Sequence, residues 1–261
     1  MIIVNDLVEL YRYKSVLRAL TTKYLFGNYK NSILGFGWHF VMPIVYLIVY
    51  YIVFSNMGSG MLPDFWIYLS CGLFPFHFMV NNLAASAGSL VNNSGLIKKM
   101  YFPRSIVIFS LILSAFIINC LGYLIVLFAI ILSGFDLNYG MLLYLPLFFI
   151  LMFIFVVGYS LILSAITVYI KDIQYLLSSM VIVFFFMTPM YFTVDNVTGL
   201  FAQVLWYNPF TYYVEAYHSL VYFGVFPEFK VVLGCVIIPV IFLIVGIAVF
   251  RLLKHGFAER L

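Results

Sequence analysis

Few side chains in this sequence could do chemistry, and they stand apart from one another. The chain has four histidines and three cysteines, and no CxxC or comparable metal-ligand spacing occurs among them. Cys71, Cys120 and Cys235 all fall within apolar runs, where a thiol behaves as a small hydrophobic group. We therefore expect no metal site, and no cofactor bound by this chain.

Glu215 and His218 form one pair whose spacing would suit joint action, because residues three apart can share a helix face. Asp136, Asp195 and Glu215 otherwise stand alone, whereas a membrane-embedded transferase needs a cluster of acids or histidines near an interface. The pair therefore indicates a gate or a structural hydrogen bond more than catalysis. We predict that the chain has no catalytic residue.

Groups that would couple transport to an energy source are also missing. The sequence has no GxxxxGK[ST] motif, which would cradle nucleotide phosphates. Ion-coupled carriers need ionisable groups along their path, and no carboxylate, Lys or Arg lies in the middle of an apolar run. If this protein moves a substrate uphill, its energy must come from another polypeptide.

The composition sets the fold class. Of the 261 residues, 66% are hydrophobic and 8% are charged, whereas soluble domains have roughly 25% charged residues. The apolar runs are long enough for helices, which need roughly 20 residues to span a bilayer. We expect an all-α integral membrane protein with six transmembrane helices, over about Ile33–Phe54, Phe65–Val91, Ser105–Leu132, Met141–Ile170, Tyr175–Val194 and Val231–Leu253.

The cations predict the orientation, because Lys and Arg in short loops mark the cytoplasmic side. Of the 13 Lys and Arg residues, all except Lys230 lie in the N-terminal segment, in the 92–104 break, at Lys171, or at and after the end of the last run. We therefore expect both termini in the cytoplasm. The net charge of +4 is a topology signal and does not imply nucleic acid.

Four segments of this single domain, residues 1–261, differ from the spans. Residues 1–31 alternate cations with leucines, which predicts an amphipathic helix in the headgroup plane; a solvated flank is the alternative. Residues 92–104 and 168–177 are short cytoplasmic breaks. Residues 195–222 are rich in Tyr and Trp and broken at Asn208–Pro209. They predict two short helices that dip into the outer leaflet, or alternatively a belt of external loops.

Five motifs, in order along nearly the whole chain, carry a resemblance. They are YKNSILGFGW at Tyr29–Trp38, Asn92 with Ile97–Lys99 and Phe102–Arg104, Tyr169–Ile173, Asn208–Tyr213, and the tail Gly256–Leu261. In these the chain resembles the membrane subunits of type-2 ATP-binding-cassette exporters, and among them bacterial polysaccharide exporters such as O-antigen, teichoic-acid and capsule permeases. Two departures are Lys171, where the family usually has Arg, and His218, near a position where Arg is frequent.

The resemblance implies a homodimer of such subunits above two ATPase subunits, which would carry ATP and Mg²⁺. It implies that the cytoplasmic breaks couple the permease to the ATPases and that Gly95–Met100 is a brief helix. The residues expected in this ATPase-coupling role are Asn92, Gly95, Leu96, Ile97, Lys98, Lys99, Phe102, Pro103, Arg104, Lys171, Asp172 and Ile173.

Three further groups of residues are implied by the same resemblance. The membrane-interface motif comprises Tyr29, Lys30, Ser32, Gly35 and Trp38. Aromatic faces suit sugar C–H surfaces, and the candidates for lining the path are Phe36, Trp38, His39, Phe74, Phe76, His77 and Tyr191. The outer gate comprises Asn208, Pro209, Tyr212, Tyr213, Glu215 and His218, and we expect Tyr212 and Tyr213 to close the outer mouth.

The sequence therefore predicts the permease subunit of an ATP-driven exporter in the bacterial inner membrane, with lipid-linked polysaccharide as its substrate. O-antigen is the first candidate, and capsule polysaccharide or teichoic acid are others. A small-molecule or lipid exporter of the same superfamily is one alternative. A membrane-embedded lipid or sugar transferase is another, from a different class.

Overall fold

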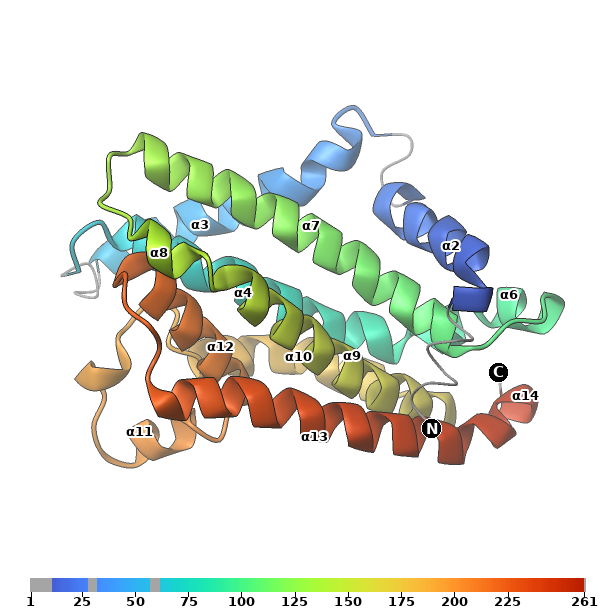
Figure 1. Cartoon of the computed structure of the whole chain (residues 1–261). Helices are drawn as coiled ribbons and strands as arrows, with labels where there is room; N and C mark the ends of the chain where they lie inside the picture. Colours follow the sequence, from blue (N-terminus) through green and yellow to red (C-terminus); the bar gives the residue numbers. More distant parts are fainter. Residues whose placement is uncertain (1–10, 28–31, 57–61, 261) are drawn as a thin grey trace.

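The computed structural model describes residues 11–27, 32–56 and 62–260, which form helices joined by short turns (Figure 1). The helices are α2 (Lys14–Phe26), α3 (Trp38–Asn56), α4 (Phe65–Ala87), α5 (Ser89–Asn92), α6 (Ser94–Lys99), α7 (Ser105–Leu132), α8 (Tyr139–Leu142), α9 (Leu145–Tyr169), α10 (Ile173–Phe186), α11 (Gly199–Leu205), α12 (Pro209–Tyr217), α13 (Phe229–Leu253) and α14 (Phe257–Arg260). Short 3₁₀ turns cover Gly35–Gly37, Val194–Asn196 and Lys254–Gly256, and a π-helical turn covers His218–Tyr222.

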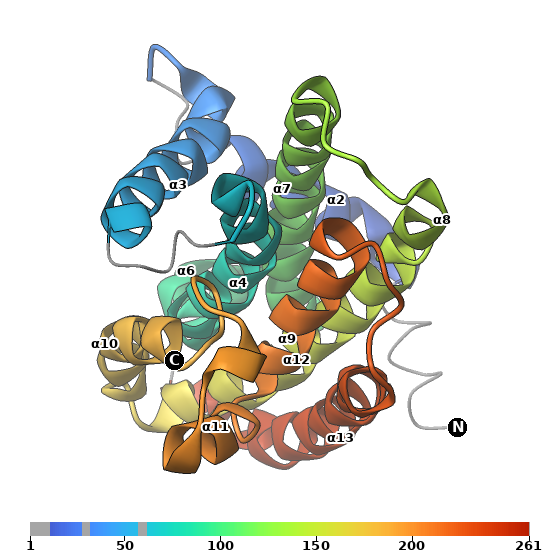
Figure 2. The same cartoon turned by 90° about the vertical axis from the view of Figure 1, so that its left-hand side faces the viewer.

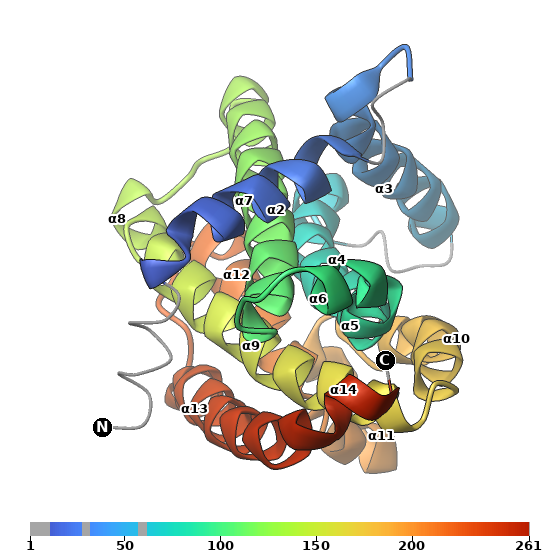
Figure 3. The same cartoon turned by 90° about the vertical axis from the view of Figure 1, so that its right-hand side faces the viewer.

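The long helices run roughly in one direction, so the molecule has two ends (Figure 1). At one end lie α6, α14 and the beginning of α2, and we call this the α6 end. At the other lie α11 and α12, and we call this the α12 end. The first and last described elements thus lie at the same end. Figure 3, which faces the α6 end, shows α2 lying across α7.

Four helical stretches in the described part of the chain are long and apolar enough to cross a membrane: Gly35–Asn56, Ser105–Leu132, Tyr139–Tyr169 and Phe229–Gly256. They correspond to the first, third, fourth and sixth of the expected spans. The third has the expected bounds, because α7 begins at Ser105 and ends at Leu132. The chain is therefore a multi-pass helical membrane protein.

The expected second span is a long helix, α4. Its polar residues make it less apolar than the four stretches named above. Figure 2, which faces the α12 end, shows α4 among other helices and α3 at the edge of the bundle. Asn82 and Ser86 are buried, and their side chains donate hydrogen bonds to the carbonyl oxygens of Phe78 and Asn82, at 2.6 and 2.5 Å. These polar groups are tolerated because they face protein and are hydrogen-bonded.

The expected fifth span, Tyr175–Val194, is wrong as a continuous helix. Helix α10 ends at Phe186 and has 14 residues, so it rises by roughly 21 Å. Pro189 explains the break, because proline disfavours helical conformation in the residue before it and has no N–H to donate. The chain beyond α10 turns instead toward Asn208, whose side-chain amide donates to the Met187 carbonyl oxygen at 3.0 Å.

The most extensive helix pairing in the molecule joins α9 to α13, and two glycines make it possible. A Cβ placed on Gly158 would stand 2.7 Å from the backbone nitrogen of Leu243, and one placed on Gly246 would collide with the carbonyl oxygen of Gly158. In a membrane, helices associate through close van der Waals packing, and small residues let their backbones approach. The α9–α13 crossing therefore depends on the absence of side chains at both positions.

We predict that Gly246→Ala destabilises the protein, because the new methyl group must push α13 away from α9. Overpacking of this kind costs about 1–3 kcal/mol. Thermal unfolding of the purified protein in lipid nanodiscs measures the effect. Gly95→Ala is the control, since a Cβ at Gly95 in α6 would meet nothing within 4 Å. Equal melting temperatures for Gly246→Ala and the control would contradict the role of this crossing.

Candidate functional site at the α6 end

Helix α6 is a short helix with a cationic, exposed end. It covers Ser94–Lys99, where the sequence predicts a helix over Gly95–Met100. Leu96 and Ile97 are half-buried and pack against the hydrophobic core, whereas Lys98 and Lys99 are exposed. Because its apolar residues hold α6 on the bundle, its two ammonium groups are presented to whatever lies beyond this end.

Asn93 connects α6 to α2, although the sequence motif points to its neighbour Asn92. The Asn93 side-chain oxygen accepts a hydrogen bond from Lys23 at 3.2 Å, and its amide donates to the Tyr24 hydroxyl at 3.0 Å and to the Ser89 carbonyl at 2.8 Å. Burial raises the pKa of Tyr24 and the Asn93 hydrogen bond lowers it, with a net rise. Asn92 is exposed. Two adjacent asparagines look alike in sequence, and only the packing of α2 distinguishes them.

Arg104 joins the linker after α6 to the C-terminal part of the chain. Its guanidinium donates a hydrogen bond to the carbonyl oxygen of Lys254 at 2.6 Å, and it lies 5.6 Å from the centre of the Phe257 ring. Phe102 and Pro103, which precede it, are half-buried. The linker Met100–Arg104 is therefore fixed against the end of α13 by a bond that sequence spacing cannot reveal.

The second break lies beside the first. Helix α9 ends at Tyr169, Lys171 and Asp172 form an exposed turn, and α10 begins at Ile173. A Cβ placed on Gly88, between α4 and α5, would stand 2.7 Å from the side-chain amide of Gln174. The start of α10 thus packs against the chain that leads into α6.

Tyr169 anchors the second break to the tail. Its hydroxyl donates to the carbonyl oxygen of Leu253 at 2.9 Å, and the Arg260 guanidinium lies 4.7 Å from the centre of its ring. Arg104 contacts the adjacent Lys254 carbonyl. The structure therefore brings both breaks, α2 and the described C-terminal segment together at the α6 end.

The described part of the interface motif forms a tight turn before α3. The Trp38 indole donates to the Ser32 hydroxyl at 2.8 Å, and Gly35 has a positive φ of 47°. A ring nitrogen of His39 lies 3.4 Å from the carbonyl oxygen of Leu25, so this turn also contacts the end of α2. Tyr29 and Lys30 lie outside the described residues.

Two of the residues expected to line a path are enclosed by other helices in this structure. Phe74 and Phe76 are buried in the bundle, at 7% and 1% exposure, and Phe76 packs edge-on against Phe185 and Phe210. The others are less enclosed: Phe36, Trp38, His39, His77 and Tyr191 are half-buried. Aromatic residues suit a helix core as well as a sugar surface, so the sequence could not separate these cases.

The expected outer-gate residues lie at the α12 end, and Tyr213 has a packing role there. It is fully buried, stacks on Phe155 with ring centres 5.4 Å apart, and its hydroxyl lies 3.4 Å from the carbonyl oxygens of Leu151 and Cys235. Tyr213 therefore fastens α12 to α9 and α13. Tyr212, which is half-buried, donates to the Trp206 carbonyl at 3.0 Å.

Asn208, Pro209, Glu215 and His218 also have local roles that the structure makes visible. Asn208 caps α12 by accepting from the Phe210 N–H at 3.0 Å, and Pro209 occupies the first turn. His218 is fully buried and stacks on Tyr68 at 3.8 Å between ring centres, while Glu215 is half-buried. In the described part of the chain, neither His218 ring nitrogen nor Glu215 Oε2 has a hydrogen-bond partner, so the pair does not act as a hydrogen-bonded acid–base couple.

Among the described residues, no group of three His, Cys, Asp or Glu side chains is arranged to hold a metal ion. At the α6 end the structure brings together exposed cations on short turns. Hydrogen bonds tie these turns to α2, α9 and α13. Such an end suits contact with another protein or with a lipid surface, and the bundle behind it is a membrane domain. The site and fold together define a helical membrane protein with an exposed cationic surface at one end.

Comparison with known proteins identifies the family. Residues 15–222 match the family described as ABC-2 type transporter, so the chain belongs to that family and is a permease subunit, which implies a separate ATPase partner. Two proteins from Klebsiella pneumoniae called O-antigen export system permease protein RfbA are each 27% identical over 246 residues, 94% of this chain and 95% of the relative. A protein of the same name from Myxococcus xanthus is 24% identical over 260 residues, 97% and 98% of the two chains. The resemblance noted in the sequence is confirmed.

We predict that Asn93→Ala loosens α2 from α6. The substitution removes hydrogen bonds to Lys23, Tyr24 and Ser89, each of which contributes about 0.5–1.5 kcal/mol. Amide hydrogen exchange over Lys14–Phe26 should become roughly tenfold faster, because local opening costs less free energy. Asn92→Ala, which changes an exposed neighbour of the same type, should leave that exchange unaltered; an equal effect of both variants would refute the link.

Proposed function

We propose that this chain is the membrane-spanning subunit of an ATP-driven exporter that moves lipid-linked polysaccharide from the cytoplasmic to the outer side of the bacterial inner membrane. O-antigen, and hence lipopolysaccharide biosynthesis, is the first candidate, with capsule polysaccharide and teichoic acid in the same class. The observation that carries the proposal is similarity to O-antigen export permeases over at least 94% of this chain. A small-molecule or lipid exporter of the same family is the rival.

The α6 end supports the coupling part of the proposal. An ATPase partner must pass its motion to the permease through a surface that is accessible and mechanically tied to the spans. Helix α6 is accessible at Lys98 and Lys99, and its linker is bonded through Arg104 to the end of α13. The exposed Lys171–Asp172 turn lies directly on the path from α9 to α10. We assign the first coupling element to residues 92–104 and the second to 168–177, both facing the cytoplasm with the termini.

Helix α3 supports the homodimer. Within the chain it packs mainly on α4, and Figure 2 shows it at the edge of the bundle. Its apolar side chains are widely exposed, including Ile48 at 52% and Ile52 at 56%. In our proposal a second copy covers part of this face, and two ATPase subunits sit beneath the pair.

Deleting the gene should abolish the surface polysaccharide, with lipid-linked glycan accumulating on the cytoplasmic side. Extraction of surface and cytoplasmic glycan from the deletion strain measures this, and the deletion strain carrying the gene on a plasmid is the control. An unchanged surface glycan would reject polysaccharide export and favour the small-molecule rival. A separate ATPase that co-purifies with the chain is required by either exporter and would exclude the transferase.

Reversing the charge of α6 with Lys98→Glu and Lys99→Glu should uncouple ATP hydrolysis from transport. The side chains are exposed, so the protein should fold with a loss of less than about 0.5 kcal/mol. Substrate-stimulated ATPase activity of the reconstituted complex should fall severalfold. Arg18→Glu, an exposed cation on α2, is the control and should retain stimulation; full stimulation in the α6 variant would disprove the coupling role.

A further inference from the structure

Both proposed coupling elements contact one aromatic ring, that of Phe257. This residue begins α14 and is fully buried, although α14 is only four residues long. The Arg104 guanidinium of the first element lies 5.6 Å from the centre of the Phe257 ring, and the Tyr169 ring of the second lies 6.4 Å away, centre to centre. On α13, the Phe250 ring stands edge-on at 5.5 Å. One side chain therefore packs against the linker after α6, the end of α9 and the end of α13.

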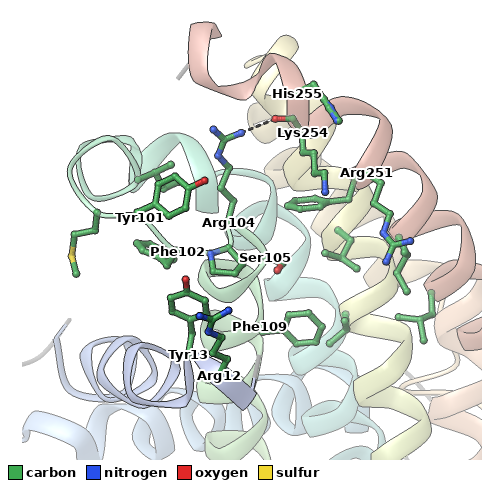
Figure 4. A pocket seen from close by; sticks show the side chains of 18 of the residues that line it. Arg12, Tyr13, Tyr101, Phe102, Arg104, Ser105, Phe109, Arg251, Lys254 and His255 are labelled. Atoms are coloured by element: carbon green, nitrogen blue, oxygen red, sulfur yellow. Dashed lines mark hydrogen bonds between the residues drawn. The ribbon is translucent and has the colours of Figure 1, made fainter. Parts of the chain in front are cut away.

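The same two elements also bind adjacent carbonyl groups just before Phe257. Arg104 donates a hydrogen bond to the Lys254 carbonyl oxygen at 2.6 Å (Figure 4), and the Tyr169 hydroxyl donates to the Leu253 carbonyl oxygen at 2.9 Å. Arg104 and Tyr169 thus make matching pairs of contacts, each with a backbone oxygen and with the Phe257 ring. The two elements, far apart in sequence, share one short stretch of chain as their partner.

This stretch lies directly on Tyr169. A Cβ placed on Gly256 would collide with the Tyr169 hydroxyl, so the turn after α13 approaches the side chain as closely as its backbone allows. The Arg260 guanidinium lies 4.7 Å from the centre of the Tyr169 ring. Residues on both sides of Phe257 therefore contact the end of α9.

On the other side, the stretch bridges an open space. A cavity of about 720 Å³ is lined by residues 100–105 of the linker and the start of α7, and also by side chains of α13 that include Phe250 (Figure 4). Along this cavity the linker and α13 do not pack directly on each other. The contacts that Arg104 makes with Lys254 and Phe257 span its edge.

We propose that residues 254–260 form a clamp that joins the two proposed coupling elements into one unit, with Phe257 as the positioning residue. The proposal rests on the coupling role proposed for residues 92–104 and 168–177. A displacement of either element would be passed to the other through the clamp. Residues 254–260 lie beyond residues 15–222, which match the family, so the family match assigns them no role.

The chemistry of Phe257 suits this position. A guanidinium is attracted to the face of an aromatic ring, and neighbouring aromatic rings favour the tilted and edge-on arrangements seen at Tyr169 and Phe250. Removing the ring leaves the two hydrogen-bonded carbonyl groups on a turn that is no longer wedged between α9 and α13. We therefore expect the loss of this one ring to loosen both elements.

Amide hydrogen exchange of the full-length chain in lipid nanodiscs tests the clamp without the ATPase partner. Phe257→Ala should speed exchange on the order of tenfold at residues 96–102 and at residues 169–175, because opening either element costs less free energy. Phe257→Leu keeps a buried apolar side chain and should stay closer to wild type. Phe148→Ala removes another buried ring, near the start of α9, and should leave both elements unchanged. Melting temperatures show whether each variant is folded.

Arg104→Ala tests whether the two elements are joined, since coupling is shown by dependence of one site on another and not by proximity. In the wild-type background it should speed exchange severalfold at residues 169–175, and in the Phe257→Ala background it should add little there. Tyr169→Phe should act in the reverse direction on residues 96–102, because coupling is reciprocal. Equal effects of Arg104→Ala in both backgrounds would overturn the clamp, as would a Phe257→Ala variant loosened in α14 alone.

Substrate-stimulated ATPase activity of the reconstituted complex then tests what the clamp does. Phe257→Ala should lower the stimulation severalfold, and Phe257→Leu should restore part of it. Full stimulation in Phe257→Ala, with both elements loosened, would overturn the role of the clamp in coupling. If no glycan stimulates the wild-type complex, the proposed substrate is rejected, and the exchange measurements still decide whether the two elements are joined.

Discussion

The approach of α9 to α13 at Gly158 and Gly246 positions much of the remaining structure. Lipid is as apolar as a leucine side chain, so helices in a membrane gain little from hiding hydrophobic surface and depend on close packing. Both helices lead directly into the α6 end: α9 ends at Tyr169, before the second break, and α13 ends at Leu253, before the tail. The Tyr169–Leu253 hydrogen bond is available because the crossing fixes how far one helix extends relative to the other.

At the α6 end a small number of directional contacts add to the apolar packing of Leu96 and Ile97 against the core. Asn93 binds α2, Arg104 binds the Lys254 carbonyl, and Tyr169 binds Leu253. Each contact joins a short surface element to a different neighbour. Asn93 links the α6 region to α2 and Arg104 links it to the end of α13, so this end combines an exposed surface with defined connections to the spans.

The sequence predicts the long helices well and the contacts between them poorly. Charges mark the start of α7, which follows Arg104, and the end of α13, which precedes Lys254, whereas Ser133 and Gly134 mark the end of α7. Pro189 marks the end of α10, but its effect is easily overlooked within an apolar run that otherwise reads as a span. Burial is harder to predict from the sequence. Phe76 and Tyr213 are aromatic, as residues of a sugar path or a gate would be, and they lie in the core. The choice between Asn92 and Asn93 depends on where α2 lies, which no local pattern contains.

The short α10 has a consequence for the membrane around the protein. Helix α7, with 28 residues, is roughly 42 Å long, and α10, with 14 residues, is roughly 21 Å long, while the hydrocarbon layer is about 30 Å thick. One side of the bundle therefore accommodates a thick bilayer by tilting, and the other favours a thin one. The Met187 carbonyl oxygen, just after the end of α10, accepts a hydrogen bond from the Asn208 side chain within the protein. The bilayer is thus expected to be deformed unevenly around the subunit, and thinnest beside α10.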